Sequence, residues 1–162
     1  MLYKILCSDL NGGLVFAQYF LDLPPEEQAE QNQKLFELAL LDWNLPGEQV
    51  MMLDNAICVF CQVNDVRIFI VGDEDELLLL HLLQTLLIVL TKVVFKSKIT
   101  VNAFVDNYAK TCLAVKELFF RVYNSFFSHI YYAKYLLCTG RDKPPQSRTY
   151  QQYTQAEIAI LK

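Results

Sequence analysis

The stretch AICVFCQVNDVRIFIVG, residues 56–72, decides the fold. Two runs of β-branched and aromatic residues, 56–63 and 66–71, flank Asn64-Asp65, and such runs are typical of strands. A two-residue connection of this type favours a tight hairpin, because asparagine and aspartate tolerate the positive φ that such turns require. The stretch therefore predicts two neighbouring antiparallel strands, within which Arg67 is the only charged residue.

A long helix is predicted directly after this hairpin. Gly72 is followed by four acidic residues, 73–76, and acidic residues at the start of a helix complement its dipole. The leucine-rich sequence beyond them predicts a helix that reaches about Val94. A second helix is expected over residues 100–120.

The chain before the hairpin predicts a second pair of strands and another helix. Asn11-Gly12-Gly13 is a hairpin signal, because glycine adopts positive φ without steric cost. Pro24-Pro25-Glu26-Glu27 is typical of a first helical turn, where proline and acidic residues are both favoured. The expected elements are strands over 2–9 and 14–21, a helix from Pro24 toward Asp42, and a short strand over 50–53.

This order of elements predicts an α+β fold. Strands joined by tight hairpins imply an antiparallel sheet, and helices before and after it imply layers. We expect a five-stranded antiparallel sheet flanked by helices, with an extra helical segment over the aromatic residues 121–138. The expected domains are 1–138, followed by a polar linker (139–149) and a short terminal helix (150–162) that together form a tail over 139–162.

The composition predicts an apolar partner. Hydrophobic residues make up 54% of the 162 residues and charged residues 20%, whereas about 45–50% and about 25% are typical of soluble domains. The surplus apolar surface requires a membrane or a protein to cover it. The net charge of −4 and the lack of a basic block argue against nucleic acid and against a polybasic membrane contact.

The cysteines and the most apolar segment bear on the compartment. The five cysteines are an odd number, and we expect no leader peptide before the first strand, so we predict buried thiols in a reducing, cytosolic compartment. Residues 77–95 are barely long enough to span a membrane. The following polar residues within them argue against a span, because they are costly in lipid: His81, Gln84, Thr85 and Lys92.

The long helix carries the candidate interface. At 100° per residue its apolar arc covers about 200°, about twice the stripe of a helix that packs on one side only. One sheet does not cover such an arc, and two interpretations stay open. Either the following helix and residues 121–138 cover the remainder, or a permanent protein partner does. The candidate interface residues are Leu79, Leu82, Leu83, Leu86, Leu90 and Val93.

No motif in the chain predicts catalysis, a metal or a cofactor. Cys58 and Cys61 have the CxxC spacing, but a zinc site needs four ligands, and residues three apart on a strand point to opposite faces. Core thiols are therefore favoured over half of a metal site. The acidic run 73–76 lacks the alternate spacing of a calcium loop, so it favours helix capping. His81 falls in the polar sector of its helix, which favours a surface histidine over a general base.

Three stretches carry a resemblance to a known family. Residues 5–20 contain a strand that ends in Asp9, a glycine turn and an aromatic-rich return strand. Residues 66–79 contain a strand, a glycine, an acidic cap and a leucine helix, and residues 104–119 form the last helix. They resemble the longin-type small subunits of heterotetrameric vesicle-coat adaptors, namely the adaptor sigma chains and the coatomer zeta chain. Residues 121–138 depart from a short Gly-Gly-containing stretch of that family, as in a divergent relative such as the small chain of the TSET (TPLATE-type) complex.

The resemblance implies a small structural subunit without enzymatic activity. Such chains pack into the helical solenoid of a large subunit, beside a medium subunit, in complexes for vesicle-mediated transport such as endocytosis. The chain would then be a cytoplasmic hetero-oligomer subunit, peripheral on membranes only through its complex. Sigma chains help to bind dileucine cargo signals, but their pocket has no residue-by-residue match here. The alternatives are a longin or roadblock-like module of a tethering or GTPase-regulating complex, and an enzyme with an unrecognised site.

Overall fold

The computed structural model describes residues 1–40 and 46–121. The chain divides into a compact unit, Met1–Val115, and a second unit, Lys116–Lys162, which is described only as far as Arg121. The predicted helix over 121–138, the linker and the tail lie beyond Arg121, outside the described residues, and so does the predicted domain boundary at 138.

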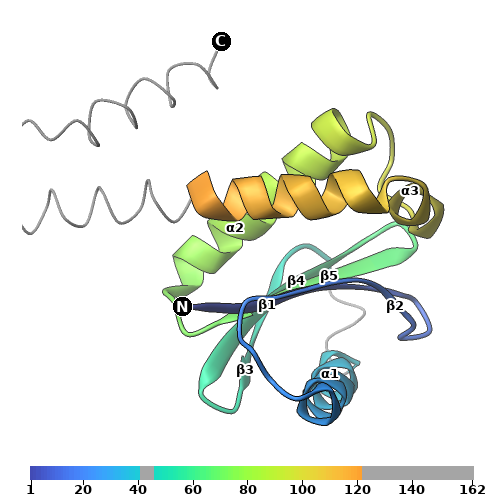
Figure 1. Cartoon of the computed structure of the whole chain (residues 1–162). Coiled ribbons are helices and arrows are strands. Elements are labelled where there is room, and N and C mark those ends of the chain that lie inside the picture. The colour runs from blue at the N-terminus through green and yellow to red at the C-terminus, as the bar shows by residue number, and fades with distance from the viewer. Residues whose placement is uncertain (41–45, 122–162) are drawn as a thin grey trace, which may run out of the picture. The chain divides into compact units, whose positions relative to one another are not determined.

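The first unit contains the predicted five-stranded antiparallel sheet. Its strands follow the order β2-β1-β5-β4-β3, so that β2 and β3 form the two edges (Figure 1). The α+β class is therefore confirmed, and it is consistent with a longin-like domain. The strand bounds are β1 Leu2–Asp9, β2 Leu14–Tyr19, β3 Gln49–Leu53, β4 Ala56–Val63 and β5 Val66–Gly72.

The hairpin turns form where the sequence predicts them. Asn64 adopts φ 55° between the paired residues Val63 and Val66, which is the conformation that a two-residue turn requires. In the β1–β2 turn, Gly12 adopts φ 85°. The Asp9 carboxylate accepts hydrogen bonds from the backbone N–H groups of Asn11 and Gly13, at 2.8 and 2.7 Å. The Asp9 side chain thus stabilises the turn that the glycine residues predict.

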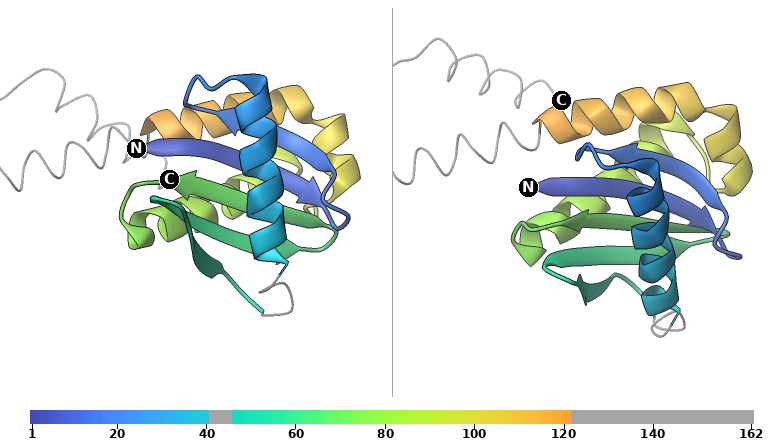
Figure 2. Two further views of the ribbon diagram at one scale, coloured as in Figure 1. Left: turned by 90° about the horizontal axis from the view of Figure 1, so that it is seen from below. Right: turned by 60° about the horizontal axis from the view of Figure 1, so that its bottom comes forward.

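The helices cover both faces of the sheet. Figures 1 and 2 place α1 (Pro25–Ala39) on one face, and α2 (Glu76–Val89) and α3 (Val101–Asp106) on the other. A π-helical turn, η1 (Leu90–Val94), extends α2, and residues 108–121 continue as helix after α3. The helix that was predicted to run toward Asp42 ends at Ala39.

The two faces differ in character. Beneath α1, Leu6, Phe60 and Phe69 belong to an apolar cluster that also contains Leu35 and Ala39 of the helix. The opposite face contains aromatic contacts around Phe104 of α3. Its ring centroid lies 6.0 Å from that of Phe16 on β2 and 5.0 Å from that of Phe95, which follows η1.

A buried polar chain ties α1 to two strands. Lys4 of β1 donates from Nζ to Asn32 Oδ1 of α1 at 2.9 Å, and Asn32 Nδ2 donates to the Tyr19 hydroxyl of β2 at 2.8 Å. Lys4 and Asn32 are both buried. Burial lowers the pKa of the Lys4 ammonium to about 8, because the apolar surroundings disfavour its charged form. The buried polar side chains of β1 and α1 thus meet on the α1 face.

Candidate interaction surface

The structure corrects the predicted interface on α2. Five of its six residues, namely Leu79, Leu82, Leu83, Leu86 and Leu90, are buried in the protein's own core. Only Val93 is exposed. The inner side of α2 lies on strands β4 and β5, so these leucines are shielded without a second chain.

The exposed part of the apolar arc of α2 is smaller than predicted, because much of the helix is covered by the rest of the protein. Its exposed stripe holds Leu77 and Ile88 among the polar residues His81, Gln84 and Lys92. Single apolar residues scattered in this way are ordinary protein surface. Within the described residues, Glu76–Val94 is also long and apolar enough to cross a membrane, and a third of that stretch is buried inside the protein.

The edge strand β2 is the first part of a better candidate surface. Among the described residues, β2 pairs only with β1, so its outer edge carries backbone N–H and C=O groups without a strand neighbour. Its six residues include no charged residue and no proline, although natural edge strands are usually protected by one of these. An edge of this kind is suited to pairing with another chain.

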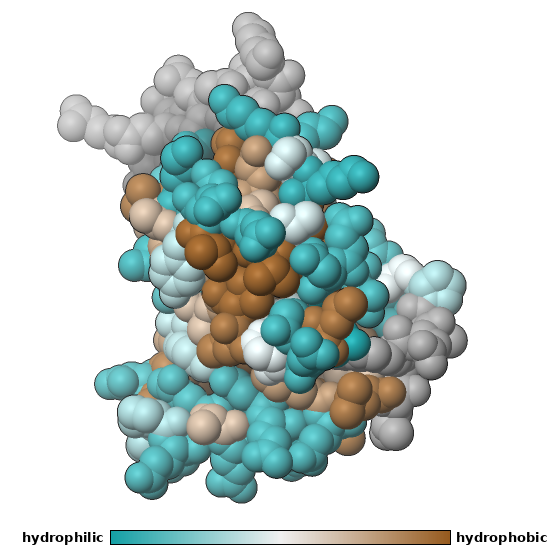
Figure 3. Space-filling view, turned by 90° about the vertical axis from the view of Figure 1, so that its right-hand side faces the viewer, coloured by the Kyte–Doolittle hydropathy of each residue, from teal (hydrophilic) through white to brown (hydrophobic). Residues whose placement is uncertain are grey.

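Apolar side chains gather around this edge. Figure 3 shows the end of the molecule that carries the β1–β2 turn and α3, with hydrophobic residues at its centre and hydrophilic residues around them. We call this surface the β2 face and define it by the exposed residues that surround the strand. They are Leu10 and Leu14 of the hairpin, Val105 of α3, and Tyr108 just after α3.

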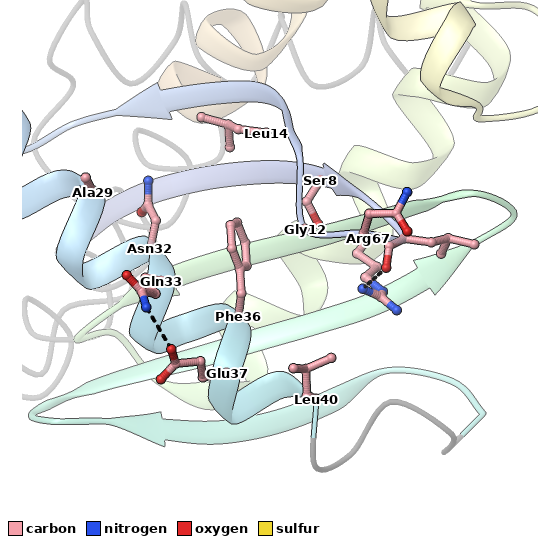
Figure 4. A pocket seen from close by; sticks show the side chains of 12 residues that line it. Ser8, Gly12, Leu14, Ala29, Asn32, Gln33, Phe36, Glu37, Leu40 and Arg67 are labelled. Atoms are coloured by element: carbon pink, nitrogen blue, oxygen red, sulfur yellow. Dashed lines mark hydrogen bonds between the residues drawn. The ribbon is translucent and has the colours of Figure 1, made fainter.

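A pocket of about 410 Å³ lies on the β2 face, between α1 and the turn of the β1–β2 hairpin (Figure 4). Its walls are apolar, and polar residues occupy its floor and rim. The apolar lining consists of Leu10, Leu14, Ala29, Phe36 and Leu40, and the polar lining consists of Ser8, Asn11, Asn32, Gln33, Glu37 and Arg67.

Ser8 and Arg67 form the floor of this pocket from adjacent strands. They face each other across the β1–β5 pairing, and both are buried. Arg67 donates from Nη1 to the Leu10 carbonyl at 2.8 Å. Burial lowers the pKa of the Arg67 guanidinium, and the charge of Asp9 acts in the opposite direction. The Ser8 hydroxyl has no hydrogen-bond partner within residues 1–40 and 46–121.

Several predicted roles of single residues are confirmed. Asp75 caps α2, because its side chain accepts from the Leu77 N–H at 2.9 Å, and His81 is exposed. Cys58 packs in the cluster beneath α1, whereas Cys61, three residues further along β4, points to the other face. Both thiols are buried, and burial raises the pKa of Cys61 to about 12.

The pocket was missed in the sequence, although two signals were present. Arg67 is the only charge in two apolar strands, and Ser8 precedes the hairpin turn. Neither residue by itself predicts that the other lies beside it or that a pocket forms there. The pairing of β1 with β5 is a long-range contact, and it is this pairing that brings the two side chains together.

Comparison with known proteins finds a relative that covers most of the chain. No family model matches the chain. The chain is similar to the TSET complex member tstD of Dictyostelium discoideum, with 27% identity over 123 residues, which cover 73% of this chain and 80% of that protein. The predicted resemblance to a subunit of the TSET complex is therefore confirmed.

Proposed function

We propose that this chain is a small, non-catalytic subunit of a TSET-type complex in membrane trafficking. The similarity to a TSET complex member over most of both chains carries this proposal. The α+β fold is consistent with it, because longin-like small subunits of coat adaptors have the same type of fold. The partners are a large subunit with a helical solenoid and a medium subunit, and the chain reaches membranes from the cytoplasm through them.

The β2 face is the proposed contact with the large subunit. It combines an uncharged, open strand edge with apolar side chains on both flanks. Burying one large apolar side chain contributes about 1.5–3 kcal/mol, so the exposed residues of the β2 face supply enough apolar surface for a permanent contact. Association through a strand edge or its flanks needs no rearrangement of the buried core.

Affinity purification of the full chain tests this proposal. The tagged chain is expected to recover one solenoid chain and one medium chain in equal amounts. Val105→Asp, at a residue that is 66% exposed, is expected to lower that recovery at least tenfold, because a charge in an apolar contact costs more than about 1.4 kcal/mol.

Met52→Asp is the matched control. Met52 lies on the opposite edge strand, β3, and is 64% exposed, so the same charge is introduced at a similar exposure. This variant is expected to recover both partners at the wild-type level. Loss of the partners in Met52→Asp alone would move the contact to β3. Capture of a small GTPase that depends on its nucleotide would instead favour the tethering or GTPase-regulating alternative.

A further inference from the structure

We propose that the pocket on the β2 face binds the carboxyl-terminal residue of a partner polypeptide, with the carboxylate against Arg67 and Ser8 and an apolar side chain against Phe36 and Leu40. This inference rests on the proposed docking of the β2 face and adds the chemical class of the group that enters it. The pocket and its buried polar floor carry the argument.

The floor supplies donors for an anion. A guanidinium presents its N–H groups in a planar fork that matches a carboxylate, and Arg67 is the cation that lines this pocket. Beside it, the Ser8 hydroxyl is buried without a hydrogen-bond partner in the described part of the chain. A buried hydroxyl in this state costs free energy, and an incoming carboxylate oxygen removes that cost.

The apolar walls favour a terminal residue with an apolar side chain. Figure 4 shows Phe36 pointing from α1 into the space between the helix and the hairpin, with Leu14 on the opposite side. A terminal residue carries its carboxylate and its side chain on the same Cα atom. One leucine-like terminal residue therefore reaches the polar floor and the apolar walls together, whereas an internal acidic residue brings only the charge.

Two acidic residues near the pocket affect the binding of an anion. Asp9 lies at the hairpin, where its carboxylate is held by the N–H groups of Asn11 and Gly13. Glu37 lies exposed at the rim and accepts a hydrogen bond from Gln33 at 2.9 Å. The charge of Glu37 repels an incoming carboxylate, so its removal is expected to strengthen binding.

Three matched peptides test the proposal on the full chain: acetyl-Ala-Ala-Leu with a free carboxyl end, the same peptide as its amide, and acetyl-Ala-Glu-Leu amide. Binding is measured by titration with NMR detection of the protein's backbone amides. The free acid is expected to bind at least tenfold more tightly than either amide. Equal binding of the acid and its amide, no binding of the acid, or tightest binding of the glutamate peptide would overturn the proposal.

Two variants with opposite expected effects separate binding from folding. Ser8→Ala is expected to weaken binding of the free acid about threefold or more without lowering the melting temperature, because it removes a buried hydroxyl that has no partner. Glu37→Gln is expected to strengthen binding about two- to fivefold, as expected for a screened surface charge. A result in which neither variant changes the affinity contradicts the proposed geometry. Recovery of the solenoid partner together with failure of the peptides would leave the proposed function standing and remove this inference alone.

Discussion

Truncation of Leu83 to alanine is expected to lower the free energy of unfolding by about 2–5 kcal/mol. Leu83 is fully buried on the inner side of α2, so its removal leaves a cavity in addition to the lost burial of its side chain. The same truncation at Leu77, on the same helix but 74% exposed, is expected to change the stability by less than about 0.5 kcal/mol.

Urea denaturation followed by far-ultraviolet circular dichroism measures both changes. The comparison holds the residue type and the helix constant and varies only the burial. A small effect at both positions would mean that the inner side of α2 is not packed on the sheet. That result would return the buried leucines of α2 to the role of an exposed interface, a role that we propose for the β2 face.

Replacement of Lys4 by methionine is expected to remove a rise of stability between pH 8 and pH 10.5. The pKa of Lys4 is about 8 in the folded protein, and its ordinary value is 10.5. Between these values the unfolded chain binds more protons than the folded chain, so the stability of the wild type rises with pH in this window. A pKa difference of this size corresponds to about 3 kcal/mol.

The measured rise is expected to be nearer 2 kcal/mol. A pocket of about 170 Å³ adjoins Lys4, between α1 and the β3–β4 turn, and solvent that enters it would screen the ammonium charge. The quantity to measure is the stability difference between wild type and Lys4→Met at each pH. Burial raises the pKa of Cys7 and of Cys61, so both thiols lower the stability at high pH, equally in the two proteins. Cys58 is electrostatically coupled to Lys4 and belongs to the measured difference. Parallel pH profiles would contradict the prediction.

The parts of the fold that could be predicted are mostly turns, caps and strands that a few neighbouring residues determine. The hairpin at Asn64-Asp65, the glycine turn after Asp9 and the acidic cap at Asp75 are all encoded within a few residues, and the structure contains each of them. The bounds of β1 and β4 also agree with the predicted strands. The end of α1 was less predictable, because Leu40 lacks a stop signal of its own and the proline of the Pro46-Gly47 pair lies further on.

The candidate surface was harder to predict, because exposure depends on contacts between distant segments. The periodicity of residues 77–94 gives the width of the apolar arc but not the depth at which the helix lies on the sheet. The lack of charge in residues 14–19 was visible in the sequence, but their position at an edge depends on the order of the strands. The match to a TSET complex member agrees with the family resemblance.

The buried charges also determine how the central strands align. All seven residues of β5 are buried, so the alternation of polar and apolar residues that usually distinguishes the two sides of a strand is absent there. Arg67 supplies the missing distinction, since its guanidinium reaches the Leu10 carbonyl on the side that also holds Lys4 and Asn32. A slip of β5 by one residue would turn this cation toward the apolar layer beneath α2, at a cost of several kcal/mol. One charged residue thus excludes the misaligned sheets that an entirely apolar strand would tolerate.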